Sequence, residues 1–339
     1  MPKLTLELET VTPLFMAGAE PDTGAELRPS SFRGAMRYWL RAWAGATSIG
    51  HNLDKLRSSE ARIFGDAGQT GASTVVVIIK TPDDFRYQRF SSQRPPSTPQ
   101  WKSSGHDYLF WSMKRSGNKP DRWAVEPNQR FSLVLGPRPG AENADKAFRQ
   151  GAVALWLLTH LGGLGSRSRR TGGSLQAVKA SGNPDLPPFV IRSYDGQELA
   201  RELETGLAVF RQAAGKSVKP TRGFDVLHPD VCRIWVVAEE KPWTDWLDAV
   251  QGIGSQLRNF RSQLPPKERQ VFGLPLQKVS KDRRASPVHL RVTRLRNGTM
   301  VGVVVLFMSQ FQAESDRPDY TRIEEFVGVF SKQWEVTGW

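Results

Sequence analysis

The chain has 339 residues, and 47 Lys and Arg against 34 Asp and Glu give it a formal net charge of +13. This length suits two ordinary domains, and such a basic balance makes polyanions the first partners to consider. The single cysteine, Cys232, excludes an internal disulfide and a cysteine-based zinc cluster, and it fits a reducing cytosol. The apolar runs are far shorter than the roughly 20 residues of a membrane span, and the N-terminus has no secretory signal, so we expect neither membrane spanning nor secretion.

The first half of the chain predicts four strands and two helices. Residues 3–11 alternate leucine with polar side chains, which indicates a half-buried strand. The other predicted elements are a helix over 30–44, strands over 73–80 and 131–135, a helix over 144–161 and a strand over 175–179. This order is typical of a ferredoxin-like or RRM-like fold, in which an antiparallel sheet carries both helices on one face.

The second half predicts a similar order. Its elements are a strand over 233–238, a helix over 243–263 whose middle is weakened by Gly252 and Gly254, a hairpin of 287–295 and 300–307 around Asn297-Gly298, and a helix over 319–334. Only 335–339 remains for a fourth strand, and without it this half is incomplete. We therefore expect an α+β protein with two ferredoxin-like domains, 1–180 with an insertion over 81–129 and 231–339, joined by a connector over 181–230.

A glycine-rich basic loop, GGLGSRSRRTGGS at 162–174, follows the helix predicted over 144–161. Glycines allow close backbone approach, and arginine and hydroxyl side chains are good donors to phosphate. Since the negative end of a helix dipole repels anions, the attraction must come from the arginines and the loop backbone. A helix cap followed by a solvated turn is the alternative, but it would account for two glycines and not five. The candidate RNA contacts are Gly163, Gly165, Ser166, Arg167, Ser168, Arg169 and Arg170.

A second basic feature lies on the helix predicted over 30–44. Arg33, Arg37 and Arg41 recur every four residues and form one ridge. No acidic residue occurs between Glu26 and Asp54. This pattern favours phosphate contact over a solvent-exposed helix face whose arginines pair with nearby acids. We therefore add the three arginines to the candidate RNA contacts.

Aromatic and basic residues are interleaved in the insertion, for example at Trp101, Lys102 and Trp111. They suit either base stacking in a single strand or docking on a neighbouring subunit, and the sequence does not separate the two. His289 and Arg291 share one face of a predicted strand, which an RRM-like sheet would leave open to RNA or to solvent.

The residues that suggest catalysis are few. His160 adjoins the basic loop, where a histidine could act as a general base toward a ribose hydroxyl, although a place in the core is the commoner outcome for such an apolar helix. Asp22 and Glu26 could hold Mg²⁺, or they could belong to a flexible acidic loop. No zinc or serine-hydrolase motif occurs in the sequence. We predict no catalytic residue, no metal and no cofactor.

Several of these segments resemble a known family. The loop at 162–174 resembles the glycine-rich loop of the RAMP superfamily of CRISPR-associated RNA-binding proteins. Residues 12–19, 26–39 and 63–65 resemble the family of subunit one of the type III-B (Cmr) effector complex, and 283–290 adds a weaker match.

The resemblance implies two ferredoxin-like domains and a non-catalytic, RNA-binding subunit of a ribonucleoprotein complex in antiviral defence in the cytoplasm. In that family the subunit lies where the complex holds the 3′ region of the guide RNA, near the entry of target RNA, and it contacts other RAMP subunits. The resemblance also implies that the arginine ridge and the loop at 162–174 contact RNA. Related subunits cleave RNA with a metal and an acidic residue placed like Asp22 or Glu26, so an endoribonuclease that uses these residues, or His160, is the alternative.

Overall fold

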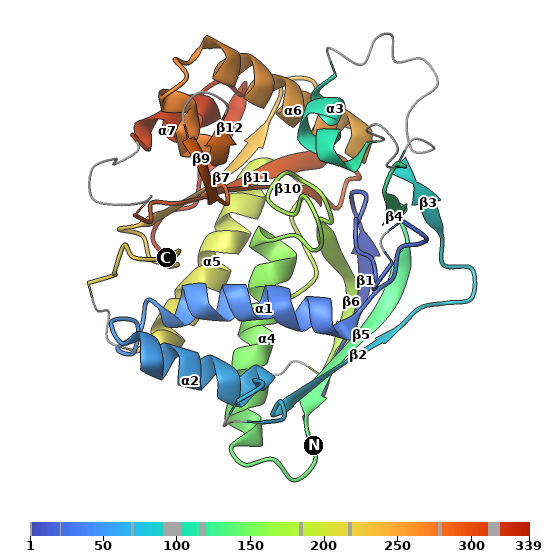
Figure 1. The fold of residues 1–339 in the computed structure, drawn as a ribbon, viewed down its shortest axis with the longest axis vertical. Helices are drawn as coiled ribbons and strands as arrows, with labels where there is room; N and C mark the ends of the chain where they lie inside the picture. The colour runs from blue at the N-terminus through green and yellow to red at the C-terminus, as the bar shows by residue number, and fades with distance from the viewer. Residues whose placement is uncertain are drawn as a thin grey trace.

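Two four-stranded antiparallel sheets lie at the centre of the protein (Figure 1). The α+β class and the ferredoxin-like element order are confirmed. The computed structural model describes residues 2–20, 22–68, 71–90, 104–114, 120–182, 186–215, 219–276, 280–310 and 319–339.

The first sheet has the strand order β2-β5-β1-β6, with antiparallel neighbours throughout. Leu4, Leu6 and Leu8 of its first strand are buried, as the alternation predicts, and they belong to one core with α1 and α4. Its elements are β1 (Leu4–Thr10), α1 (Pro29–Ala44), α2 (Leu53–Phe64), β2 (Val75–Lys80), β5 (Arg130–Pro137), α4 (Ala144–Leu161) and β6 (Leu175–Ser181). Helix α2 has no counterpart in the predicted order.

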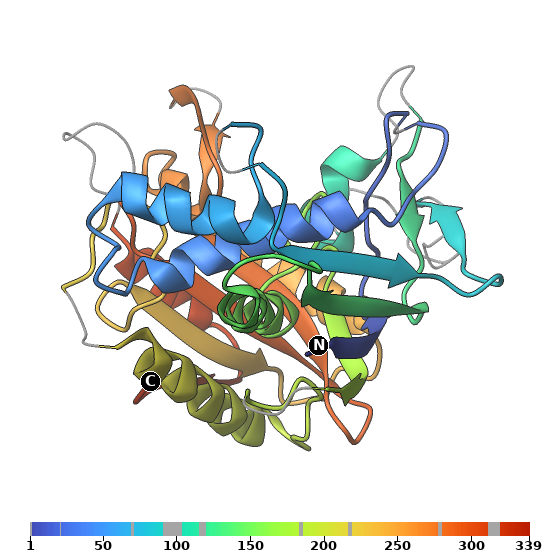
Figure 2. The same cartoon turned by 90° about the horizontal axis from the view of Figure 1, so that it is seen from below.

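The second sheet has the order β10-β11-β7-β12 and is complete. One of its faces packs against α6 and α7, and the other packs against α4 and α5. In Figure 2, α4 is seen nearly end-on between α1 and α5. The elements of this half are α5 (Gly196–Ala214), β7 (Cys232–Ala238), α6 (Trp246–Gln263), η3 (Glu268–Phe272), β8 (Leu274–Leu276), β9 (Ser280–Arg284), β10 (Val288–Arg294), β11 (Met300–Phe307), α7 (Thr321–Val327) and β12 (Lys332–Glu335).

Three predictions for this half are wrong. The helix predicted over 319–334 ends at Val327, and the fourth strand lies at Lys332–Glu335 rather than 335–339, because these residues pair with β7. The helix predicted over 243–263 is confirmed as α6, and the two glycines do not split it. His289 and Arg291 face neither RNA nor solvent, because helices of the first half cover that side of the sheet. The division at 180 and 231 stays a prediction.

The insertion packs partly onto its own chain. Helix α3 (Gly105–Phe110) lies against α6, and Phe90, Phe110 and Phe15 join the core beneath it. Its other described elements are β3 (Tyr87–Arg89), η2 (Trp111–Met113) and β4 (Trp123–Val125). Residues 91–103 and 115–119, with the predicted stacking residues Trp101 and Lys102, lie outside the described residues.

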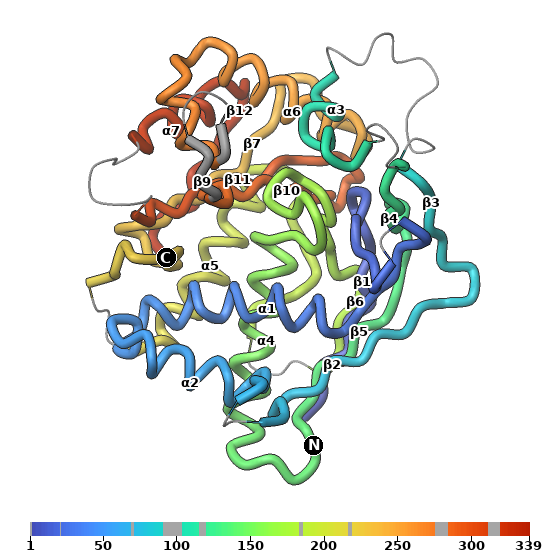
Figure 3. Tube along the Cα trace, viewed as in Figure 1, coloured from blue at the N-terminus to red at the C-terminus, as the bar shows by residue number. Residues whose placement is uncertain are grey.

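The loop at 162–174 closes the open edge of β10, an end strand of the second sheet (Figure 3). Thr171 N donates to Leu290 O at 2.8 Å, and Val292 N donates to Ser174 Oγ at 3.1 Å. A strand edge without such partners would leave buried peptide groups unsatisfied. The second half of the loop therefore serves the junction between the two sheets.

Arg291 completes this junction from β10. Its buried guanidinium donates to the carbonyls of Thr159, Gly162 and Leu175, the last at 2.9 Å. Two of these carbonyls belong to the C-terminal end of α4, where unpaired carbonyls and the helix dipole favour a cation. Burial lowers the pKa of Arg291 to about 9, so the group remains charged at neutral pH.

The contact between α3 and α6 depends on two glycines that meet at the backbone. A Cβ at position 254 would lie 2.1 Å from Gly105 O, whereas a Cβ at Gly34 in α1 would meet nothing within 4 Å. We expect Gly254→Ala to destabilise the protein by about 1–3 kcal/mol through overpacking. The matched Gly34→Ala should stabilise it by up to about 1 kcal/mol through helix propensity. Urea unfolding measures both, and equal effects would contradict the proposed close contact.

Arg291→Leu tests the junction. Three buried carbonyl oxygens lose their donor, so we expect a loss of about 3 kcal/mol in the free energy of unfolding. Arg201→Leu, on the exposed side of α5, is the control and should change it by less than about 0.5 kcal/mol. A loss below about 1 kcal/mol in Arg291→Leu would show that the junction does not depend on this charge.

Candidate RNA-binding site

The outer half of the loop at 162–174 is the part open to solvent. Gly165 and Ser166 are exposed, and Arg167 and Ser168 are half-buried. Ser166 N donates to Phe15 O at 2.8 Å, which ties the loop to the segment after β1. A Cβ at Gly165 would lie 2.4 Å from Phe15 O, and the φ of this residue is +80°. Glycine is therefore required here by close packing as well as by backbone conformation.

Arg167 lies beside a second arginine from α6. Its Nε donates to Leu109 O at 2.6 Å, and Arg261 Nη1 donates to Tyr108 Oη at 2.5 Å on the same helix α3. Burial and the charge of Arg261 lower the pKa of Arg167. Arg261 Nε is buried and has no hydrogen-bond partner in the described part of the chain.

Arg170 lies deeper, against the backbone of the second half. It donates to Phe272 O at 2.7 Å, to Ser286 Oγ at 3.0 Å and to Val288 O at 3.3 Å. Burial, followed by the charge of Arg167, lowers its pKa to about 9. Arg170 is thus committed to protein acceptors, and we assign it to the junction rather than to direct phosphate contact.

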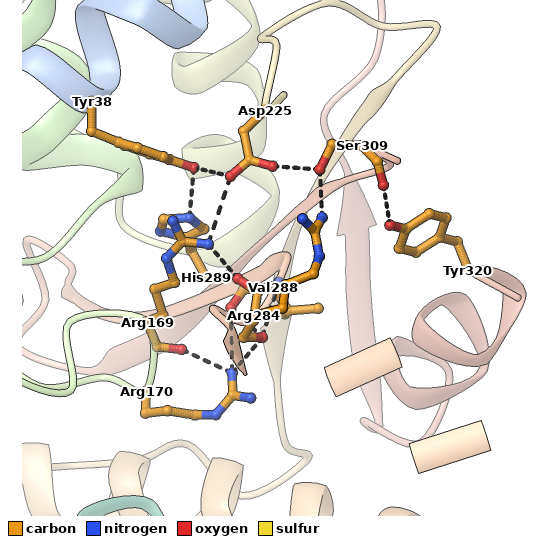
Figure 4. A network of polar contacts seen from close by, with 10 residues as sticks. Tyr38, Arg169, Arg170, Asp225, Arg284, Val288, His289, Ser309 and Tyr320 are labelled. Atoms are coloured by element: carbon orange, nitrogen blue, oxygen red, sulfur yellow. Dashed lines mark hydrogen bonds and ion pairs between the residues drawn. The ribbon is translucent and has the colours of Figure 1, made fainter. Parts of the chain in front are cut away.

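Arg169 belongs to a network around Asp225 that joins the two halves (Figure 4). Its guanidinium donates to Ser286 O, lies over the Tyr38 ring at 5.0 Å and is 3.6 Å from Asp225 Oδ2. Tyr38 Oη donates to the same carboxylate at 2.8 Å, and burial raises the pKa of this tyrosine well above its usual value. Arg169 is therefore held at the junction as well.

Three arginines at and beneath the outer half of the loop, Arg167, Arg170 and Arg261, form a cluster with an excess of positive charge. Among the described residues, no carboxylate lies within ion-pair distance of Arg167, Arg170 or Arg261. Each of these cations raises the cost of charging the others, as the lowered pKa values of Arg167 and Arg170 indicate. Such a cluster favours a bound anion, and the exposed backbone of Gly165 and Ser166 makes the site accessible.

The ridge on α1 is only partly available. Arg37 and Arg41 both pair with Glu60 of α2, at 3.2 and 2.8 Å, so the expectation of unpaired arginines is wrong for these two. Their partner comes from a helix that the sequence analysis did not place against α1. Arg33 is half-buried and lines a cavity of about 360 Å³ together with Gly65. It is the member of the ridge that remains a candidate contact.

Sequence reasoning missed Arg261 and named Trp111 only as one of several candidates for base stacking. Arg261 was not singled out, because no local pattern places α6 beside the loop. Trp111 was one of many aromatic residues in the insertion, yet its side chain is 68% exposed while Phe90 and Phe110 are fully buried. A large ring exposed two residues after Leu109, the acceptor of Arg167, is suited to stacking on a base.

The residues suggested for catalysis are placed less favourably. His160 is buried and stacks on Trp156 with 3.8 Å between ring centroids, and burial lowers its pKa to about 3. Asp22 pairs with Arg122 at 3.1 Å, and Glu26 lies 4.0 Å from Arg28. Within the described residues no three His, Cys, Asp or Glu side chains form a metal-binding group, and no helix is long and apolar enough to cross a membrane.

Comparison with known proteins gives consistent matches. The chain is 26% identical, over 98% of both chains, to the CRISPR system Cmr subunit Cmr1-1 of Pyrococcus furiosus. It is 32% identical to Cmr1-2 of the same organism over 50% of this chain and 92% of that relative.

The fold is similar to that of solved structures. The crystal structure of Cmr1 from Pyrococcus furiosus in its apo form matches with a TM-score of 0.70 and 22% identity, over 100% of this chain and 99% of that one. A chain in the cryo-EM structure of type III-B Cmr-beta bound to cognate target RNA matches with a TM-score of 0.65 and 12% identity, over 96% and 98%. The model of the RAMP superfamily matches residues 7–176, half of the sequence, and the chain therefore belongs to the RAMP superfamily.

Proposed function

We propose that this chain is an RNA-binding subunit of a type III-B Cmr ribonucleoprotein complex in the cytoplasm, and that it holds guide or target RNA in antiviral defence. The names of its relatives, two Cmr1 subunits, support the place in the complex. The arginine cluster at Arg167 and Arg261, which has no carboxylate partner among the described residues, carries the proposal for RNA. Guide RNA, target RNA and other RAMP subunits are the partners that follow.

In this proposal the outer loop contacts the RNA backbone. Arg167 neutralises a phosphate, and the exposed hydroxyl of Ser166 donates to a phosphate or ribose oxygen. Ser168 and the backbone of Gly163 and Gly165 belong to the same surface. Arg169 and Arg170 act from beneath it, since their hydrogen bonds hold the loop to the start of β10 and to the segments before it, and the charge of Arg170 raises the local potential.

Contacts of this kind do not read the base sequence. Guanidinium groups and backbone donors recognise phosphate, and an exposed ring such as Trp111 stacks on any base. A subunit that must accept many different guide sequences requires such tolerance. Arg33, on α1, is a further phosphate contact in the same proposal, while Arg37 and Arg41 hold α1 to α2.

We further propose that the chain binds RNA without cleaving it. His160 is buried with a pKa of about 3, which makes it a weak base out of reach of a ribose hydroxyl. The carboxylates of Asp22 and Glu26 are each next to an arginine. No observation on these residues favours an endoribonuclease over a binding subunit.

The salt dependence of RNA binding tests the cluster. For a single strand, log K against log salt has a slope of about −0.7 per neutralised phosphate. We expect Arg167→Ala with Arg261→Ala to reduce the magnitude of this slope by about 0.7 to 1.4 on a 5′-labelled oligouridylate. Arg201→Ala with Lys241→Ala, two exposed cations elsewhere, is the control. An unchanged slope in the Arg167 and Arg261 variant would remove the loop from the RNA site.

Cleavage is tested with the same labelled RNA. We expect the strand to remain intact after incubation with the purified chain, in Mg²⁺ and in EDTA alike. Asp22→Ala should bind as the wild type does, because its carboxylate pairs with Arg122 and belongs to no metal group among the described residues. Cutting that EDTA abolishes and that Asp22→Ala lacks would establish the endoribonuclease instead.

A further inference from the structure

A groove of about 1,070 Å³ lies between α2 and the N-terminal end of α4. Figure 1 shows these two helices side by side, away from the labelled strands of the second sheet. The segment after α1 and the end of α5 also line the groove. None of the candidate RNA contacts named so far belongs to its lining.

The charge of the groove is positive. Asp54 and Glu142 are the two carboxylates of its lining. The cations on its walls are Lys55, Arg62, Arg138 and Lys146. Two of these come from α2, and the other two come from the segment after β5 and from α4, so both sides of the groove present positive charge.

The spacing along α2 suits an extended ligand. Lys55 and Arg62 are seven residues, or two helical turns, apart on one face, which separates them by about 10 Å along the axis. Ser58 and Ser59 lie between them and also line the groove. Cations repeated along a wall, with hydroxyls between them, match a chain of phosphates and riboses better than a single anion.

These cations have no carboxylate partner among the described residues. Lys55 and Lys146 are exposed, and neither they nor the two arginines form an ion pair with any described residue. Arg62 Nε donates to Ser58 O at 3.3 Å and Arg138 Nε donates to Ser73 O at 2.9 Å, which orients both side chains through the backbone. Four cations held without carboxylate partners are available to a ligand.

The groove adjoins the smaller cavity at Arg33. Ala72 lines both, and Arg62 and Ile63 of the groove are followed in the chain by Phe64 and Gly65 of the smaller cavity. A path lined by Arg33 and Arg37, with Asp66 beside them, therefore runs past the end of α2 into the groove.

We propose that this groove binds the sugar-phosphate backbone of a single RNA strand, as a second contact region that continues from Arg33. The inference rests on the proposed function and adds a site to it. Recognition is independent of base sequence, because the aromatic residue in the lining, Trp43, is only 8% exposed and its indole N–H donates to Phe210 O. Asn143 and Gln150, which line the opposite wall, supply further donors for ribose and phosphate.

The test compares three variants of the full chain on one long oligouridylate. The groove variant is Lys55→Ala with Arg62→Ala and Lys146→Ala. The loop variant is Arg167→Ala with Arg261→Ala, and the control replaces Arg57, Arg201 and Lys241, all exposed and outside the groove, by Ala. Affinity is measured over a range of salt concentrations, with circular dichroism to verify that each variant is folded.

We expect the groove variant to lose about 2 in the magnitude of the salt slope, 0.7 for each of three phosphates, and the control to lose none. A groove variant that behaves like the control, while the loop variant loses slope, overturns this inference and leaves the proposed function intact. If neither loses slope, the proposed function fails with it. Binding of poly-glutamate that the groove variant loses, with RNA binding unchanged, would assign the groove to an acidic peptide and also overturn it.

Discussion

The negative end of α4 and the open edge of β10 meet inside the protein, and both require hydrogen-bond partners there. Arg291 supplies a buried cation to the carbonyls at the end of α4. The loop that leaves α4 supplies peptide and side-chain groups to the edge of β10. A buried charge is costly unless it is well bonded, and here two of the three carbonyls that Arg291 bonds are ones that the helix end would otherwise leave unsatisfied. The relative position of the two sheets depends on this constraint.

The same constraint divides the loop into two parts with different roles. Residues from Arg169 to Ser174 are held against β10 and the segment before it, so their arginines are fixed by protein carbonyls. Residues from Gly165 to Ser168 remain at the surface, above these fixed charges. Because the inner arginines cannot move to relieve repulsion, the outer arginine lies in a field that favours an anion. One motif thus serves both the junction and the proposed RNA contact.

Local sequence patterns predicted the strands, helices and turns whose formation depends on residues near one another in the chain. Alternating leucines gave β1, helical periodicity gave α1 and α4, and Asn297-Gly298 gave the hairpin of β10 and β11. The outcomes that could not be predicted depend on residues distant in the sequence. Glu60 neutralises Arg37 and Arg41 because α2 lies beside α1, and no acidic residue near the arginines indicated it. Helix α6 has a glycine at position 254 because the backbone of α3 approaches it there and leaves no room for a Cβ. Arg261 lies beside the loop because the tertiary fold places α6 there, and no local pattern indicates this.

The most direct test of the account is a photo-crosslink in an assembled complex. Guide RNA and target RNA, each in turn with 4-thiouridine replacing uridine, would be crosslinked to the protein and the modified peptides identified by mass spectrometry. The account predicts modification at residues 163–168 and at Trp111, with Arg170 and Arg291 unmodified because both are held at the junction. Crosslinks that avoid 163–168 and Trp111 altogether, in a complex that retains its RNA, would contradict the central claim that the outer loop contacts the strand.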